Sequence, residues 1–291
     1  MTIAGIERKF VEHLASIYPL NEVRSLAFLA VSHILKLDRI HYLNSKNDIL
    51  SLMDETSILQ ILNELATGRP FQYIIGETEF YGLPFYVNPS VLIPRPETEE
   101  LVEWVLKEMR DFQLDAGAKK IKILDIGTGS GCIPVSIKKN SPEVEITAID
   151  ISFEALETAI KNAVLNKTEI HFLQDDIFNS KLNNQDSKFN IIISNPPYVM
   201  ETEKERMHQN VLAHEPHTAL FVSDENPLIF YHTIADFAAL HLEKEGYLFF
   251  EINENLGKQT LQLLEQKGFT NLELRQDLRG KDRMIKAQLV T

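Results

Sequence analysis

A strand that runs directly into a glycine-rich turn and then into a helix constrains the fold of this chain most strongly. Residues 122–126 have the apolar pattern of a buried strand, glycines follow at 127, 129 and 131, and a helical pattern begins at Ile133. Strand and helix patterns then alternate, with further strands expected at 144–150, 171–178, 191–193, 247–252 and 284–289. The alternation predicts an α/β fold with a doubly wound, mostly parallel, Rossmann-like sheet, whose last strand can be antiparallel.

The residues in and around this turn predict its ligand. Small residues let the backbone approach a ligand closely, and the following helix directs its N–H groups at that ligand. Asp150 ends the next strand about twenty residues downstream, where a carboxylate binds a ribose diol. The G-x-G-x-G spacing differs from the spacing that suits a pyrophosphate, and Asp125 would repel a phosphate but attract an ammonium or a sulfonium. S-adenosyl-L-methionine carries both cations and no phosphate, so we expect it as the cofactor; a turn that serves packing alone is the alternative. The site predicted here comprises Asp125, Gly127, Thr128, Gly129, Ser130, Gly131 and Asp150.

Further contacts to the cofactor are expected from Asn195 and from the residues after the strand at 171–178. Asp176 is placed to accept a hydrogen bond from an adenine amino group, while Ile177 packs on the adenine ring. Alternatively, Asp175 and Asp176 cap a turn of their own backbone.

The sequence Asn195-Pro196-Pro197-Tyr198 follows a buried strand and predicts the acceptor site. It lies at the carboxyl end of the sheet, where open α/β sheets bind their ligands. The Asn195 side-chain oxygen and the Pro196 carbonyl are two acceptors for the two N–H groups of a planar –NH2, and Tyr198 offers a flat ring for stacking. This arrangement predicts alkylation of a planar –NH2 nitrogen, in which Asn195, Pro196 and Tyr198 are catalytic and need no histidine or cysteine. The alternative is a rigid turn whose asparagine caps its own backbone.

Two other polar features of the sequence are Arg95 and a pair of histidines. Arg95, between two prolines, is either a placed functional cation or a surface arginine that pairs with a neighbouring acid. His214 and His217 fit no standard zinc spacing and have no cysteine nearby, so no metal is expected.

The patterns divide the chain into three parts. Residues 1–75 have helical periodicity and are predicted to form a small domain that recognises substrate. Residues 76–95 alternate aromatic residues around Gly82 and Pro84 and predict a β-hairpin that links the domains. Residues 96–291 are expected to form the catalytic domain.

Charge and composition narrow the function. A formal net charge of −13 argues against a general nucleic-acid surface, which requires basic patches. The single Cys132 suits a reducing cytoplasm. The sequence has neither a run of about 18 apolar residues nor a signal segment, so no membrane association is expected.

Taken together, the motifs resemble a known family. Gly127–Gly131, Asp150 and Asn195–Tyr198 look like a class I S-adenosylmethionine-dependent methyltransferase. The segments Ile93–Glu99, Glu215–Leu220 and Asp277–Arg283, together with the helical first domain, resemble the HemK/PrmC family, the protein-(glutamine-N5) methyltransferases that act on peptide-chain release factors. The resemblance covers nearly the whole chain.

The resemblance implies a reaction and a role for each motif. Gly127–Gly131 and Asp150 would hold the methionine and ribose parts of the cofactor, and Asp176 and Ile177 would lie by the adenine, although the family often has an aromatic residue at the latter position. Asn195–Tyr198, with Pro197 included, would hold the glutamine of a Gly-Gly-Gln motif. In-line attack of its amide nitrogen on the sulfonium methyl would give N5-methylglutamine and S-adenosylhomocysteine, without an assigned general base.

The sequence is also compatible with other functions. The acceptor could be a glutamine of a ribosomal protein, or the –NH2 of adenine in DNA or RNA, although the acidic charge disfavours nucleic acid. An inactive nucleoside-binding module is disfavoured by the intact acceptor turn, and a nicotinamide dehydrogenase by the glycine spacing.

Overall fold

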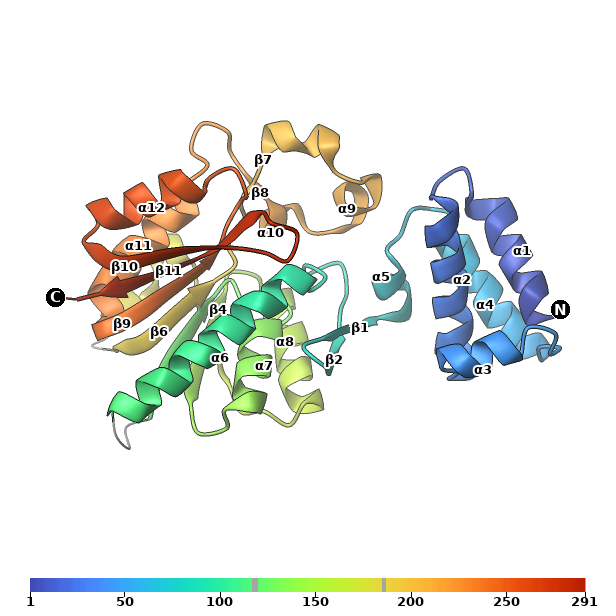
Figure 1. Cartoon of the computed structure of the whole chain (residues 1–291), viewed down its shortest axis with the longest axis horizontal. Coiled ribbons are helices and arrows are strands. Elements are labelled where there is room, and N and C mark those ends of the chain that lie inside the picture. Colours follow the sequence, from blue (N-terminus) through green and yellow to red (C-terminus); the bar gives the residue numbers. More distant parts are fainter. Residues whose placement is uncertain (117–119, 185–186, 291) are drawn as a thin grey trace. The chain divides into compact units, whose positions relative to one another are not determined.

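The computed structural model describes residues 1–116, 120–184 and 187–290, and it separates into two compact units. Unit 1 comprises residues 1–76 together with 208–214. Unit 2 comprises residues 77–207 and 215–291. Figure 1 shows helices alone in the first unit and a sheet flanked by helices in the second.

Unit 1 is a helical domain, as predicted. Each of three helices begins at a polar residue whose side chain accepts a backbone N–H: Thr2 from Gly5, Asp38 from His41, and Ser51 from Asp54. Apolar residues at helical spacing then meet in one core, which contains Ile6, Phe10, Leu14, Val31, Ile58 and Leu62. The helices are α1 (Ile3–Leu14), α2 (Leu20–Leu35), α3 (Arg39–Asn44), α4 (Leu52–Leu65), α5 (Phe71–Ile75) and the distant α9 (Gln209–His214).

Helix α9 joins this unit although it lies far along the chain. The Asn210 side-chain Nδ2 donates to the Tyr18 hydroxyl at 2.8 Å, and the His208 ring stacks on the Tyr18 ring. A segment between the acceptor turn and Glu215 therefore packs as part of the helical domain.

Unit 2 is organised by a twisted sheet of seven strands within the described residues. The strands are β3 (Lys122–Ile126), β4 (Glu145–Asp150), β5 (His171–Gln174), β6 (Phe189–Ser194), β9 (Leu242–Glu251), β10 (Phe269–Gln276) and β11 (Asp282–Leu289). Their order is β10-β11-β9-β6-β3-β4-β5. The run from β9 to β5 is parallel, and β11 is antiparallel to both of its neighbours. The doubly wound sheet with an antiparallel last strand is confirmed; β10 was not predicted.

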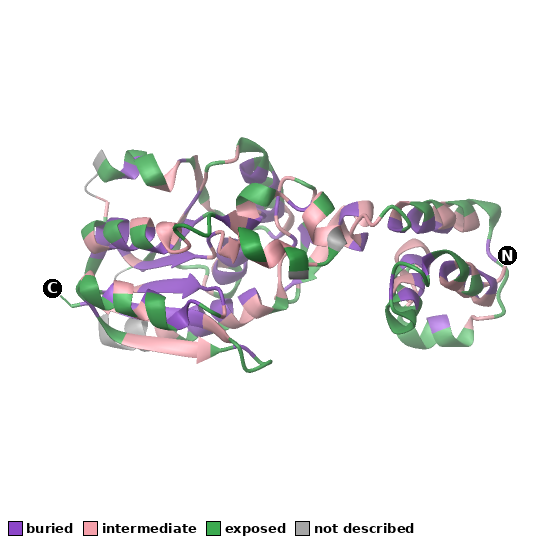
Figure 2. Cartoon of the chain, turned by 90° about the horizontal axis from the view of Figure 1, so that it is seen from above, coloured by how far each residue is buried: buried purple, intermediate pink, exposed green. Residues whose placement is uncertain are grey.

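Helices cover both faces of this sheet (Figure 1). Residues of β6 alternate between two cores: Ile191 and Ile193 pack with α6 and α7, whereas Ile192 packs with α11 and α12. Burial on both faces explains why this strand consists of consecutive isoleucines. Figure 2 shows buried strands at the centre of the unit, whereas the edge strands β5 and β10 are mostly intermediate or exposed. The covering helices are α6 (Pro96–Ala116), α7 (Cys132–Asn140), α8 (Phe153–Leu165), α11 (Ile229–His241) and α12 (Gly257–Gln266).

The predicted hairpin is present as β1 (Glu77–Phe80) and β2 (Leu83–Tyr86), with Tyr81 and Gly82 at positive φ in the turn. It is anchored to the sheet domain by Asn162 of α8, whose amide bonds the backbone N–H and carbonyl of Tyr86 at 2.6 and 3.0 Å. The same amide donates to the Ser130 carbonyl at 2.9 Å. The hairpin and the glycine-rich turn are therefore held by one side chain.

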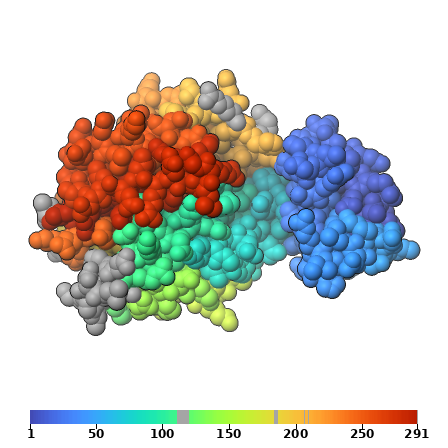
Figure 3. Space-filling view, in the orientation of Figure 1, coloured from blue at the N-terminus to red at the C-terminus, as the bar shows by residue number. Residues whose placement is uncertain are grey.

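The C-terminal strands are fastened to α6, and Figure 3 shows these elements together on one side of unit 2. Lys286 of β11 bonds Glu108 of α6 at 2.8 Å, and the Arg275 guanidinium of β10 lies 3.8 Å from the centroid of the Trp104 ring. These contacts fix the position of α6, whose first turn borders the site described below.

The segment 175–224 contributes short elements around the acceptor turn. They are η1 (Ile177–Asn179), η2 (Lys181–Asn184), β7 (Val199–Met200), η3 (Glu201–Arg206), α10 (His217–Leu220) and β8 (Phe221–Val222). β7 and β8 pair in parallel, so the segment after the acceptor turn contains ordered structure.

Candidate active site

A cavity of about 440 Å³ opens at the carboxyl ends of β3, β4 and β6. The sheet order reverses here, because the chain runs outward from β3 to β4 and β5 on one side and then to β6 and β9 on the other. Open α/β sheets bind ligands at such a switch point. The predicted residues that line the cavity are Gly127, Thr128, Gly129, Ser130, Asp150, Asp176, Ile177, Asn195, Pro196 and Pro197. Asp125, Gly131 and Tyr198 are not among the lining residues.

The glycine-rich turn has backbone angles that require glycine. Gly127, Gly129 and Gly131 have φ of 75°, 54° and 78°. A Cβ at Gly131 would lie 3.0 Å from the Ala159 Cβ, so this glycine also allows α8 to approach closely. Added Cβ atoms at Gly127 and Gly129 would meet nothing within 4 Å, which leaves the turn open to the cavity.

Asp150 is fixed by the backbone. Its Oδ2 accepts from the Gly129 N–H at 2.8 Å and its Oδ1 from the Ser152 N–H at 2.9 Å. Burial raises the pKa of Asp150, and these hydrogen bonds oppose the rise. Because each carboxylate oxygen has a second acceptor site, the group can still accept bonds from two hydroxyls in the cavity.

Asp125 is the most unusual group at the site. It is 1% exposed, and within the part of the chain that the structure describes neither carboxylate oxygen has a hydrogen-bond partner. The Thr128 hydroxyl is buried in the same way. Burial raises the pKa of Asp125 to about 7, and the neighbouring Thr128 hydroxyl opposes the rise. A buried acid left without a partner is costly, so this position fits a cationic ligand group nearby.

After β5, the structure shows the capping alternative at Asp176, while its contact with adenine stays a prediction. Asp176 Oδ1 accepts from the Phe178 N–H at 3.0 Å and so caps η1, while the residue also lines the cavity. Beside Ile177, the rings of Phe178 and Phe230 lie 5.1 Å apart and line the same cavity. These two aromatic residues were missed; the position of the first, next to Ile177, was the available signal.

The acceptor turn directs its asparagine toward α6. Asn195 Nδ2 donates to Thr98 Oγ1 at 3.4 Å, and the Thr98 hydroxyl in turn donates to Glu251 at 2.7 Å. The Tyr198 hydroxyl donates to the other oxygen of Glu251 at 3.0 Å, and burial raises the pKa of Tyr198 well above its usual value. The stacking role of the Tyr198 ring therefore stays a prediction, while Thr98 and Glu251 were missed.

Arg95 lines the cavity and pairs with an acid, but one that lies 120 positions away. Its Nη2 donates to Glu215 Oε1 at 2.6 Å, and the Ile93 N–H donates to Oε2 at 3.3 Å. This pair connects two segments that were linked only by resemblance. Among the described residues, no group of three or more His, Cys, Asp or Glu side chains is arranged to hold a metal, and no helix is long and apolar enough to cross a membrane.

Comparisons with known proteins agree with this geometry. The family model described as the Methyltransferase small domain matches residues 109–223, and the PrmC N-terminal domain matches residues 8–76. A solved structure, the T. Thermophilus 16S rRNA N2 G1207 methyltransferase in complex with AdoMet and guanosine, shares the fold with a TM-score of 0.50 and 16% identity, over 73% of this chain and 49% of that chain. The fold and the site thus define a Rossmann-like methyltransferase.

Two curated relatives are similar over nearly the full length. The release factor glutamine methyltransferase of Flavobacterium psychrophilum is 48% identical over 98% of this chain and 99% of its own. The protein of the same name in Bacteroides thetaiotaomicron is 41% identical over 95% of this chain and 96% of its own. The chain belongs to the family of release factor glutamine methyltransferases.

Proposed function

We propose that this enzyme transfers a methyl group from S-adenosylmethionine to the side-chain amide nitrogen of the glutamine in the Gly-Gly-Gln motif of peptide-chain release factors. The observation that carries the proposal is that one cavity is lined by both the glycine-rich turn and the Asn-Pro-Pro acceptor turn. Such a substrate places the enzyme in the cytoplasm, in contact with protein and not directly with nucleic acid.

The cofactor side of the cavity fits S-adenosylmethionine. Asp125, a buried carboxylate that accepts no hydrogen bond from the described residues, suits the neighbourhood of the methionine ammonium, and Asp150 suits the ribose diol. Ile177, Phe178 and Phe230 supply apolar and aromatic surface for the adenine. When bound, S-adenosylmethionine supplies an electrophilic methyl group on a sulfonium.

The acceptor side fits a primary amide. Asn195 Oδ1 and the Pro196 carbonyl are acceptors for its two N–H groups, and the two prolines make this backbone rigid. An amide nitrogen becomes positively charged as it is alkylated, so acceptors that hold its hydrogens stabilise the transition state more than the ground state. Orientation of the two reactants in one cavity supplies much of the remaining acceleration.

Unit 1 is proposed to recognise the release factor. Within fourteen residues of its chain it exposes several large apolar side chains, an arrangement typical of protein contacts. These side chains, which we call the α3–α4 patch, are Ile40, Leu43, Ile49, Leu52 and Met53.

The proposal is tested with purified enzyme, S-adenosylmethionine and a release factor. We expect one methyl group per release factor, and none when the Gly-Gly-Gln glutamine is replaced by alanine or glutamate. Equal methylation of the wild-type and substituted release factors would contradict the proposed acceptor.

A further inference from the structure

Behind the acceptor turn, the Glu251 carboxylate, the Thr98 hydroxyl and the Asn195 amide are connected by hydrogen bonds. We propose that Thr98 and Glu251 are positioning residues, which orient this amide so that its oxygen, and not its nitrogen, faces the acceptor glutamine. The inference rests on the proposed function and adds a requirement for two residues whose pairing is not visible in the sequence.

The three groups come from three separate elements. Thr98 lies in the first turn of α6 and is 2% exposed, Glu251 ends β9 and is 1% exposed, and Asn195 directly follows β6. The Thr98 hydroxyl lies 2.7 Å from Glu251 Oε2 and 3.4 Å from Asn195 Nδ2. Thr98 also lines the cavity, so these hydrogen bonds connect the buried Glu251 to the edge of the site.

The direction of the hydrogen bonds follows from the chemistry of each group. An ionised carboxylate only accepts, so the Thr98 hydroxyl must donate its single hydrogen to Glu251. That hydroxyl then has only lone pairs to offer Asn195, and a lone pair attracts the amide NH2 rather than the amide oxygen. The Asn195 Nδ2 is held toward Thr98, and Oδ1 is turned to the opposite side of the amide.

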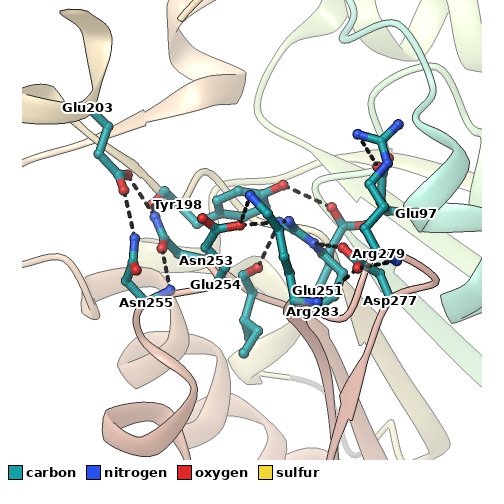
Figure 4. A network of polar contacts seen from close by, with 12 residues as sticks. Glu97, Tyr198, Glu203, Glu251, Asn253, Glu254, Asn255, Asp277, Arg279 and Arg283 are labelled. Carbon is teal, nitrogen blue, oxygen red and sulfur yellow. Dashed lines mark hydrogen bonds and ion pairs between the residues drawn. The ribbon is translucent and has the colours of Figure 1, made fainter. Parts of the chain in front are cut away.

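Glu251 is kept as an acceptor by its surroundings. The Tyr198 hydroxyl donates to its other oxygen at 3.0 Å, and Figure 4 shows these two residues in a polar network with Arg283 and Asp277. Burial raises the pKa of Glu251, whereas the hydrogen bonds from Thr98 and Tyr198 and the charge of Arg283 oppose the rise. Both hydroxyls therefore favour the ionised form of Glu251, which the hydrogen bonds to Thr98 and Asn195 require.

The orientation of the Asn195 amide matters because its oxygen accepts hydrogen bonds whereas its nitrogen donates them. If Nδ2 faced the cavity, its hydrogens would meet the hydrogens of the substrate –NH2, and one of the two acceptors would be lost. Asn195 could still be present and well packed, yet the transition state would lose that stabilisation.

The first test replaces Thr98 by valine, which keeps the shape and removes the hydroxyl. We expect kcat for release factor methylation to fall about five- to tenfold, the effect of one hydrogen bond, while KM for the release factor and Kd for S-adenosylmethionine change less than about twofold. Thr98→Ser should return kcat to within about twofold of wild type, because it restores the same donor and acceptor. The matched control is Thr260→Val, since Thr260 is also fully buried but its hydroxyl bonds the Leu256 carbonyl in α12.

A second measurement separates positioning from a general loss of structure. Thr98→Val is combined with Asn195→Ala, and single-turnover rates of the double variant are compared with those of Asn195→Ala alone. We expect the rates to agree within about twofold, since an amide that is absent cannot be oriented. Thr98→Ala repeats the series if thermal melting shows that the valine variant is unfolded.

Several results would overturn the inference: unchanged kcat in Thr98→Val, no recovery in Thr98→Ser, or the same fall in the Asn195→Ala background. Failure of the proposed function itself is distinguished beforehand, because wild-type enzyme would then leave the release factor glutamine unmethylated.

Discussion

Replacement of Asn195 by alanine removes one of the two proposed acceptors for the glutamine amide. The variant should bind S-adenosylmethionine within a few-fold of wild type, because the cofactor contacts proposed for Asp125 and Asp150 are unchanged. Its kcat should nearly vanish, since the lost acceptor acts on the nitrogen whose charge develops during the reaction.

The expected losses of kcat and of stability in Asn195→Ala follow from the hydrogen bonds of its side chain. Removing one preorganised group that stabilises developing charge costs about 2.7–4 kcal/mol, or about 10²–10³-fold in kcat. The Asn195 side chain makes one long hydrogen bond to Thr98, at 3.4 Å, so the free energy of unfolding should change by no more than about 1 kcal/mol. The activity loss therefore exceeds the stability loss.

The assay measures single-turnover methylation of a release factor, cofactor affinity by calorimetry and stability by urea unfolding. Asn190→Ala is the matched control, because Asn190 lies on the same strand at its amino end, where its side chain accepts from the Lys122 N–H at 2.9 Å. Wild-type rates in Asn195→Ala, or an equal loss in Asn190→Ala, would refute the acceptor role.

Three further predictions address the cofactor site and unit 1. Asp150→Ala should raise Kd for S-adenosylmethionine about 10- to 100-fold, because charge-assisted hydrogen bonds to the diol are lost; an unchanged Kd by calorimetry would remove Asp150 from the ribose site. The pKa of Asp125 is about 7 in the folded protein, so between about pH 4 and pH 7 the unfolded chain releases a proton that the folded chain keeps, and stability falls as pH rises. Urea unfolding without cofactor should therefore show that Asp125→Asn gains stability relative to wild type from pH 5 to pH 8. A difference in unfolding free energy that stays constant over this range would show that the pKa of Asp125 is not raised in the folded protein. Leu43→Glu in the α3–α4 patch should raise KM for the release factor several-fold with little change in cofactor Kd, whereas Leu240→Glu, on an exposed position of α11, should leave KM unchanged.

Much of the site could be predicted because its signals are local. The glycines at 127, 129 and 131 have positive φ, which other residues adopt only with strain, so their spacing is visible in the sequence. The prolines after Asn195 mark the acceptor turn in the same way. Consecutive isoleucines in β6 likewise reveal a strand buried on both faces.

Features that depend on tertiary contacts were missed for physical reasons. Strand β10 lies at the sheet edge and contains Thr270, Asn271 and Glu273, so it lacks the apolar run of a central strand. Thr98 and Glu251 are 153 positions apart and become partners only when α6 packs on the sheet. The periodicity of apolar residues in the sequence does not indicate such a long-range pair.

The domain boundaries also depend on tertiary contacts that the sequence does not show. A division into consecutive segments cannot place residues 208–214 with the helical unit, because that assignment arises from contacts such as Asn210 with Tyr18. The hairpin that the sequence suggested as a linker packs in unit 2 through Asn162.

The most direct test of the central claim locates the transferred methyl group. Purified enzyme is incubated with methyl-labelled S-adenosylmethionine and, separately, with release factors, ribosomal proteins, DNA and RNA, and the label is placed by mass spectrometry. We predict label on the side-chain amide of the Gly-Gly-Gln glutamine of a release factor, and its loss in Asn195→Ala. Label on a ribosomal protein or on adenine, with release factors unmodified, would contradict it.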